Sequence, residues 1–212
     1  MSHMDLDWDK IRRVYAKYLD FKPGYIGGGL RYGSIPLWMA DRIQAYSRFS
    51  PYFRSENLHD TKKVCEAYGR WLLASNNKSW TNLQRVGNRA LEQPEKLCSL
   101  IGYLQEETVP IEERVQKGLA GGYKVDGVGK GILTGLLHTL FSEKHGVWNG
   151  STEKAFRKLD VNIPGITSTT YGRTYFDVNE ALNEMAVRLG ASLTYVDGFM
   201  WYVATKLTSS LR

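Results

Sequence analysis

The sequence predicts an all-α fold, a compact bundle of about ten helices. Apolar residues recur at spacings of three and four, as in Val64, Ala67, Tyr68, Trp71 and Leu72. The alternation of apolar and polar residues that is typical of strands does not continue beyond short loops, and no linker-like segment divides the 212 residues. One helical domain with a sizeable core is therefore expected.

Helix-start signals and apolar spacing place the elements of the first half. An acidic start precedes a helix over 7–19, and the glycine-rich segment 24–33 is expected to form a loop or a loose hairpin. Pro36 suits the first turn of a helix that runs to about 49. Asp60 is a good N-cap for a helix that runs to about 75. Shorter helices are predicted over 81–92, 94–105 and 111–119.

The second half begins with two helices that a short polar loop joins. The first, over 130–141, is strongly apolar, and the second, over 151–159, is more charged. A loop rich in Pro, Gly and Thr is expected over 162–173. It leads to a helix over 178–189 and to an apolar last helix that begins near 195.

Composition narrows the classes of ligand. A formal net charge of +6 favours a polyanionic partner, although many proteins without such a partner are equally basic. Cys65 and Cys98 are expected to be core thiols, because two isolated cysteines form no metal-site spacing. His138 and His145 have no second ligand at metal spacing. Neither a metal nor an organic cofactor is expected.

The chain contains no apolar run long enough to span a bilayer and no signal peptide, so a cytoplasmic protein without a membrane partner is expected. Residues 1–4 read as a cloning remnant, which leaves 5–212 as a single helical domain.

The most informative segment is 125–159, where Gly127, Val128 and Gly129 form a tight turn that opens the apolar helix. Glycine takes positive φ without cost, and the following helix begins with unsatisfied N–H groups that favour an anion. A DNA phosphate is the obvious anion for a basic protein. The alternative is a loop that merely joins two packed helices.

This segment resembles the helix-hairpin-helix region of the HhH-GPD superfamily of base-excision DNA glycosylases. Asp126 stands where that family usually has proline, and Gly127 to Gly129 match its hairpin turn. Gly131 falls in the slot of the nucleophilic lysine, and Asn149 falls in the slot of the catalytic aspartate. The resemblance implies two helical lobes around a cleft, roughly 109–160 against 5–107 plus 174–212. It also implies a monovalent cation at the hairpin.

Both catalytic residues of the family are therefore substituted. Asparagine is neutral and cannot act as a base, and glycine cannot be a nucleophile. Lys130 is adjacent to the lysine slot, but one residue along a helix is a rotation of about 100°. The sequence thus favours a non-catalytic module that binds double-stranded DNA. Whether it reads a modified or damaged base, and whether it flips that base out, stays open at this point.

Two alternatives remain open. An active but divergent glycosylase or lyase would use Asp126, Asp160 or Asp197 as its charged group, and a purely protein-binding helical domain would have no DNA affinity. A second, weaker resemblance involves 127–159 and 195–201. These segments are similar to N-terminal specificity regions of modification-dependent restriction systems. That resemblance implies a partner motor or nuclease, as a further domain or as a subunit.

Candidate contacts follow from these readings. The predicted DNA-binding residues are Lys124, Gly127, Val128, Gly129, Lys130, Ser151, Thr152 and Lys154. For Ser151 and Thr152, simple capping of a helix is the alternative. Trp148 and Asn149 are candidates for a base pocket, with a core tryptophan beside an Asn-Gly turn as the alternative.

Two further basic or aromatic groups are candidate contacts. Tyr25, Arg31 and Tyr32 are candidates for groove contacts, unless they belong to a structural turn. A run of basic residues is either a second DNA contact or ordinary surface: Arg42, Arg48, Arg54, Lys62, Lys63 and Arg70.

Overall fold

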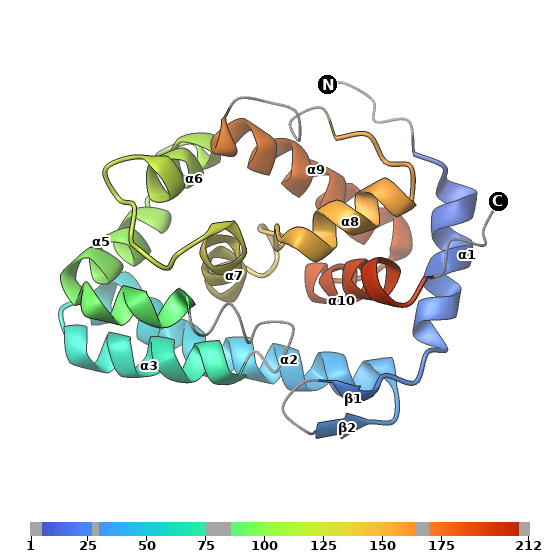
Figure 1. Ribbon diagram of the computed structural model, residues 1–212, viewed down its shortest axis with the longest axis horizontal. Helices are drawn as coiled ribbons and strands as arrows, with labels where there is room; N and C mark the ends of the chain where they lie inside the picture. Colours follow the sequence, from blue (N-terminus) through green and yellow to red (C-terminus); the bar gives the residue numbers. More distant parts are fainter. Residues whose placement is uncertain (1–5, 27–29, 75–85, 164–169, 208–212) are drawn as a thin grey trace.

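The computed structural model describes residues 6–26, 30–74, 86–163 and 170–207. Within these ranges the regular secondary structure is helical apart from one short strand pair, which confirms the all-α prediction (Figure 1). The α-helices are α1 Trp8–Leu19, α2 Ile35–Phe49, α3 Thr61–Ala74, α5 Pro94–Leu104, α6 Ile111–Ala120, α7 Lys130–Leu140, α8 Gly150–Lys158, α9 Tyr171–Leu189 and α10 Leu193–Thr205. Short 3₁₀ helices cover Ser50–Phe53, Ser55–Asn57 and Asn88–Glu92.

Local capping signals explain most helix starts. The Asp7 carboxylate accepts a hydrogen bond from the Lys10 N–H at 2.9 Å, and the Asp60 carboxylate accepts one from the Lys63 N–H at 3.0 Å. Such side-chain acceptors satisfy N–H groups that have no partner inside the helix. Pro36 lies in the first turn of α2, as its fixed φ favours.

Two boundaries differ from the sequence-based expectation. α9 begins at Tyr171 rather than near 178, because the Thr170 hydroxyl caps it and Tyr175 adds a buried side chain to its inner face. The described part of the helix predicted over 81–92 includes a 3₁₀ helix over Asn88–Glu92, and its first half lies outside the described residues. The expected loop over 162–173 falls partly outside the described residues, and the expected cloning remnant over 1–4 lies wholly outside them.

The glycine-rich segment after α1 is a hairpin of two strands, β1 Gly24–Ile26 and β2 Leu30–Tyr32. The strands pair antiparallel, with Gly24 opposite Tyr32. A hairpin was one of the two forms expected for this segment. Gly24 has a φ of +63°, in the left-handed region that glycine enters without cost.

α7 lies at the centre of the molecule with the other helices around it (Figure 1). Every residue from Gly131 to Leu140 is buried, so this helix is enclosed on all sides. Its buried polar groups find partners: the Thr134 hydroxyl accepts the Trp148 N–H at 2.9 Å, and the Thr139 hydroxyl accepts the Trp71 indole N–H at 3.0 Å. The core is therefore built around the helix that the glycine turn opens.

One cluster of buried side chains runs through both expected lobes. It includes Val115, Leu133 and Phe156 from 109–160, together with residues of α1, α2 and α10. α8 packs against α10, and α6 packs against α9. The two segments expected as lobes thus share a core in this structure.

Candidate nucleic-acid interface

The turn before α7 has a backbone that requires glycine. Gly127 has a φ of +87°, and a β-carbon there would lie 2.2 Å from the Val86 carbonyl oxygen. The Val128 N–H donates to the Val125 carbonyl at 3.1 Å, and both valine side chains are buried. The turn is therefore fixed from inside, by its valines and by the close approach of the 86–90 segment.

Gly129 forms the outer part of the same turn. Its φ of −92° and ψ of −179° are extended backbone that any residue adopts, and a β-carbon there would meet no atom within 4 Å. Among the residues that the structure describes, no side chain caps α7, for which Gly129 is the N-cap residue. The Ile132 N–H donates to the Gly129 carbonyl at 3.0 Å, so the N–H groups of Lys130 and Gly131 are the ones at the start of α7 that an anion would favour.

Charged side chains surround this opening unevenly. Lys124 and Lys154 are exposed, and so is Asp126. Lys130 is already engaged: its Nζ lies 2.5 Å from a Glu153 carboxylate oxygen and 4.8 Å from the centre of a tryptophan ring, that of Trp148. Among the predicted basic contacts of this region, Lys124 and Lys154 are therefore the ones whose charge faces solvent.

The start of α8 satisfies its own N–H groups. The Asn149 side-chain oxygen accepts from the Ser151 N–H at 2.8 Å and from the Thr152 N–H at 3.1 Å. The Asn149 N–H in turn donates to the Thr152 hydroxyl at 3.3 Å, which completes a capping box. The N-cap is therefore Asn149: Thr152 takes part in capping through its hydroxyl, and Ser151 takes part through its backbone N–H.

Trp148 is 3% exposed and packs near the rings of Tyr171 and Tyr175. Its indole N–H donates to the Glu153 carboxylate at 2.9 Å. In this conformation the ring is a core side chain and presents no free face to a base.

The two catalytic slots of the HhH-GPD resemblance come together in space. A β-carbon on Gly131 would lie 3.3 Å from the Asn149 β-carbon. Glycine and a capping asparagine thus occupy neighbouring positions, and neither side chain is a nucleophile or a base.

The three carboxylates considered as alternatives lie apart. Asp126 is exposed in the hairpin turn. Asp160 has a φ of +59° and pairs with Lys10 at 2.5 Å, with its side chain 81% exposed. Asp197 is buried and forms an ion pair with Arg42. Asp160 and Asp197 therefore each have a cation as partner.

The candidate groove residues and the basic residues between 42 and 70 do not lie on one common surface. The Tyr32 hydroxyl donates to the Asp41 carboxylate at 2.6 Å and its ring is buried, while the side chains of Tyr25 and Arg31 lie outside the described residues. Arg42 is buried. Arg48, Lys63 and Arg70 line one surface pocket, Arg54 lines another, and Lys62 is exposed.

Next to the second of these pockets lies a buried polar cluster of Arg42, Tyr46, His138, Thr194 and Asp197. The sequence shows these residues only as isolated polar positions in apolar helices, so it did not predict that they meet. The Arg42 guanidinium donates to the Tyr46 hydroxyl at 2.7 Å as well as to Asp197. Burial lowers the pKa of His138 to about 4. The neutral ring donates from Nδ1 to the His145 carbonyl at 2.7 Å and accepts at Nε2 from the Thr194 hydroxyl at 3.0 Å.

Within the described ranges, no group of three or more His, Cys, Asp or Glu side chains is placed to hold a metal ion. No helix in the same part of the chain is long and apolar enough to cross a membrane. Comparison with protein-family models, curated proteins and solved structures found no match to this chain.

Proposed function

We propose that this chain is a non-catalytic module that binds double-stranded DNA through the 125–129 turn and the first turn of α7. The observation that carries the proposal is the uncapped start of α7 behind Gly129, where a β-carbon would meet nothing within 4 Å. A phosphate group of the DNA backbone would accept hydrogen bonds from the first N–H groups of α7.

Lys124, which precedes this turn in the chain, and Lys154, which follows Glu153 in α8, are both exposed, and they would neutralise phosphates of the bound duplex. Each such contact releases counterions from DNA, so affinity should fall steeply as salt rises. Contacts of this kind fix the position of the module on the duplex, and they carry no information on sequence. Reading of a base would come from other side chains.

The residues at the catalytic slots support binding without chemistry. Gly131 offers no side chain, and the Asn149 side chain is committed to the start of α8. The Asp197 carboxylate pairs with Arg42 inside the core. We therefore propose a recognition role in a restriction or repair system, with a motor or nuclease supplied by a partner domain or subunit.

Flipping of a modified base is part of this proposal, and it requires a change in the conformation seen here. Since Trp148 is 3% exposed, the 147–149 segment would have to open before its indole could stack on a base. Base flipping costs a few kcal/mol by itself. Binding to a lesion that already weakens stacking should therefore be tighter than binding to intact DNA.

The test is a fluorescence-anisotropy titration at low salt against one duplex in five versions: unmodified, with methylated cytosine, with oxidised guanine, with uracil and with an abasic site. Tight binding to one version would name the base that is read. Equal binding to all five, lost at high salt, would leave general duplex binding. No binding to any version would refute the proposal.

Gly129→Leu provides the matched variant. Its backbone accepts any residue, so the variant should fold, but the leucine would block the approach of a phosphate to α7. We expect a loss of affinity of at least about tenfold. Val187→Leu is the control for a surface leucine, because Val187 is 82% exposed on α9, outside both the turn and the 24–33 segment. Unchanged affinity of Gly129→Leu would reject the hairpin as the contact.

A chemical control separates binding from catalysis. The same five duplexes are incubated with the protein, treated with borohydride or with alkali, and analysed for covalent complexes and strand breaks. Neither product is expected. A trapped lysine adduct or alkali-labile sites would show an active glycosylase or lyase instead.

A further inference from the structure

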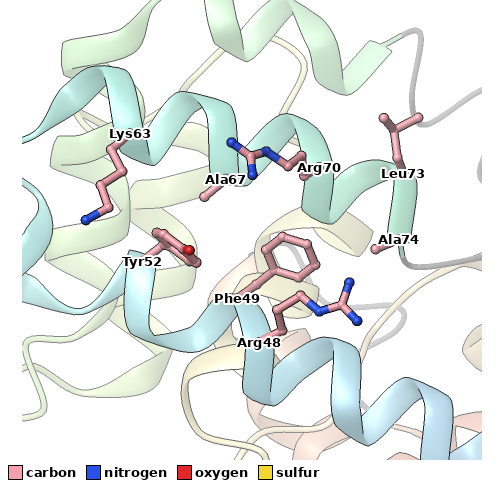
Figure 2. A pocket seen from close by; sticks show the side chains of 8 residues that line it. All are labelled: Arg48, Phe49, Tyr52, Lys63, Ala67, Arg70, Leu73 and Ala74. Carbon is pink, nitrogen blue, oxygen red and sulfur yellow. The ribbon is translucent and has the colours of Figure 1, made fainter.

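A surface pocket lies between α2 and α3, in a part of the molecule that the hairpin does not use (Figure 2). Its volume is about 390 Å³, within the range of sites that hold small ligands. The lining residues are Arg48, Phe49, Tyr52, Lys63, Ala67, Arg70, Leu73 and Ala74.

The interior of the pocket is apolar and aromatic. Phe49 and Ala67 are almost fully buried and lie between the two helices, and Tyr52 stands half-buried beside them (Figure 2). Leu73 is 64% exposed at one end. An aromatic or apolar ligand group would bury this surface favourably.

The rim carries positive charge on both sides. Arg48 extends from α2, whereas Lys63 and Arg70 extend from α3 (Figure 2). Arg70 pairs with Glu66 at 3.1 Å in an exposed i,i+4 contact, which is a weak pair. Lys63 lies 5.7 Å from the centre of the Tyr52 ring. In the described part of the chain, Arg48 and Lys63 have no carboxylate partner.

We propose that this pocket binds a nucleotide, with the base against the half-buried Tyr52 over a floor formed by Phe49, and the phosphate at Arg48, Lys63 and Arg70. An apolar slot with an aromatic wall suits a base, since stacking on aromatic side chains tolerates any base. Guanidinium groups donate paired hydrogen bonds to phosphate oxygens, and a lysine ammonium group adds a positive charge. The proposal does not depend on DNA binding by the hairpin.

A ligand with one base and one phosphate is either a free nucleotide or the terminal nucleotide of a single strand. The test is isothermal titration calorimetry of the full chain with four probes: AMP, adenosine, inorganic phosphate, and a short oligothymidylate that carries a 5′ phosphate. We expect saturable binding of AMP that is at least about tenfold tighter than binding of adenosine or phosphate alone, because base and phosphate each contribute. Tighter binding of the oligonucleotide than of AMP would assign the site to strand ends, and the reverse to free nucleotides.

Three variants locate the site. Arg48→Gln and Lys63→Gln should each weaken AMP binding by about tenfold, as expected for a lost charge-assisted contact. Tyr52→Leu should weaken the binding of AMP and adenosine but not that of phosphate. Lys17→Gln is the matched control, since Lys17 is an exposed lysine on α1.

Failure of this proposal is distinct from failure of the hairpin proposal. Gly129→Leu should bind AMP as the unaltered chain does. Absence of AMP and oligonucleotide binding at millimolar concentration, or binding that none of the three pocket variants changes, would overturn the nucleotide site. Binding of an acidic peptide in place of all four probes would overturn it as well.

Discussion

Gly131 in the first turn of α7 lies against Asn149, the N-cap residue of α8, so that a β-carbon on Gly131 would lie 3.3 Å from the Asn149 β-carbon. The Asn149 side chain holds the first turn of α8 through its capping box. A larger residue at 131 would have to move a side chain that is fixed by two hydrogen bonds. The absence of a side chain at 131 and the asparagine at 149 are thus one structural feature.

The first prediction concerns the cap. Asn149→Ala removes the acceptor for the Ser151 and Thr152 N–H groups and should lower the free energy of unfolding by about 1–2 kcal/mol. Asn149→Asp keeps an equally good acceptor and places a negative charge at a helix start, so its stability should stay within about 0.5 kcal/mol. Urea denaturation measures both. Equal losses in the two variants would show that the cap is not what Asn149 supplies.

The second prediction concerns the inner glycine of the turn. Gly127→Ala should lower the free energy of unfolding by at least about 2 kcal/mol, because positive φ is strained for alanine and because its β-carbon would overlap the Val86 carbonyl. Gly122→Ala, at an exposed glycine with open space, is the control and should change little. Thermal denaturation followed by circular dichroism distinguishes them, and similar melting temperatures for both would contradict the geometry.

The third prediction concerns the buried ion pair. Asp197→Asn leaves the Arg42 guanidinium without its carboxylate and should cost about 3–5 kcal/mol, as breaking a buried pair does. The double variant Arg42→Met, Asp197→Leu removes both charges and should recover most of that loss. The comparison is made by urea denaturation at pH 7. A double variant no more stable than the single one would mean that the charges do not act as a pair.

The fourth prediction concerns acid. Burial lowers the pKa of His138 from 6.5 to about 4. Below pH 6.5 the His138 ring is therefore protonated in the unfolded chain, whereas in the folded chain it stays neutral until the pH approaches 4. Stability is therefore full above pH 6.5 and falls toward pH 4, at up to about 1.4 kcal/mol per pH unit for this group. Burial also lowers the pKa of His145 to about 4, which adds to the slope.

His138→Asn tests this assignment. It keeps a donor for the His145 carbonyl but cannot titrate. The variant should be less stable at pH 7 and should lose less stability than the unaltered chain between pH 7 and pH 5. Urea midpoints across this range give the comparison, and parallel curves would show that His138 does not carry the acid sensitivity.

The helices were predictable because their signals are local. Asp60 lies directly before α3 and Pro36 lies in the first turn of α2, and the period of the apolar residues in 61–74 marks the buried face of α3. The late start expected for α9 was wrong because Tyr171 to Asp177 contains too few aliphatic residues to reveal the pattern, although Tyr175 is fully buried. Aromatic and polar side chains can be buried in a core when neighbouring helices provide packing and hydrogen-bond partners for them.

The sequence by itself determined the helical class, the places of most helices and the glycine turn at 127–129, since each depends on residues within a few positions of one another. Only the tertiary structure decided that Trp148 faces the core and that Arg42 meets Asp197. It also decided that Arg48 and Arg70 flank one pocket. These relationships join distant parts of the chain, and packing between helices sets them, whereas periodicity shows only which face of each helix is buried.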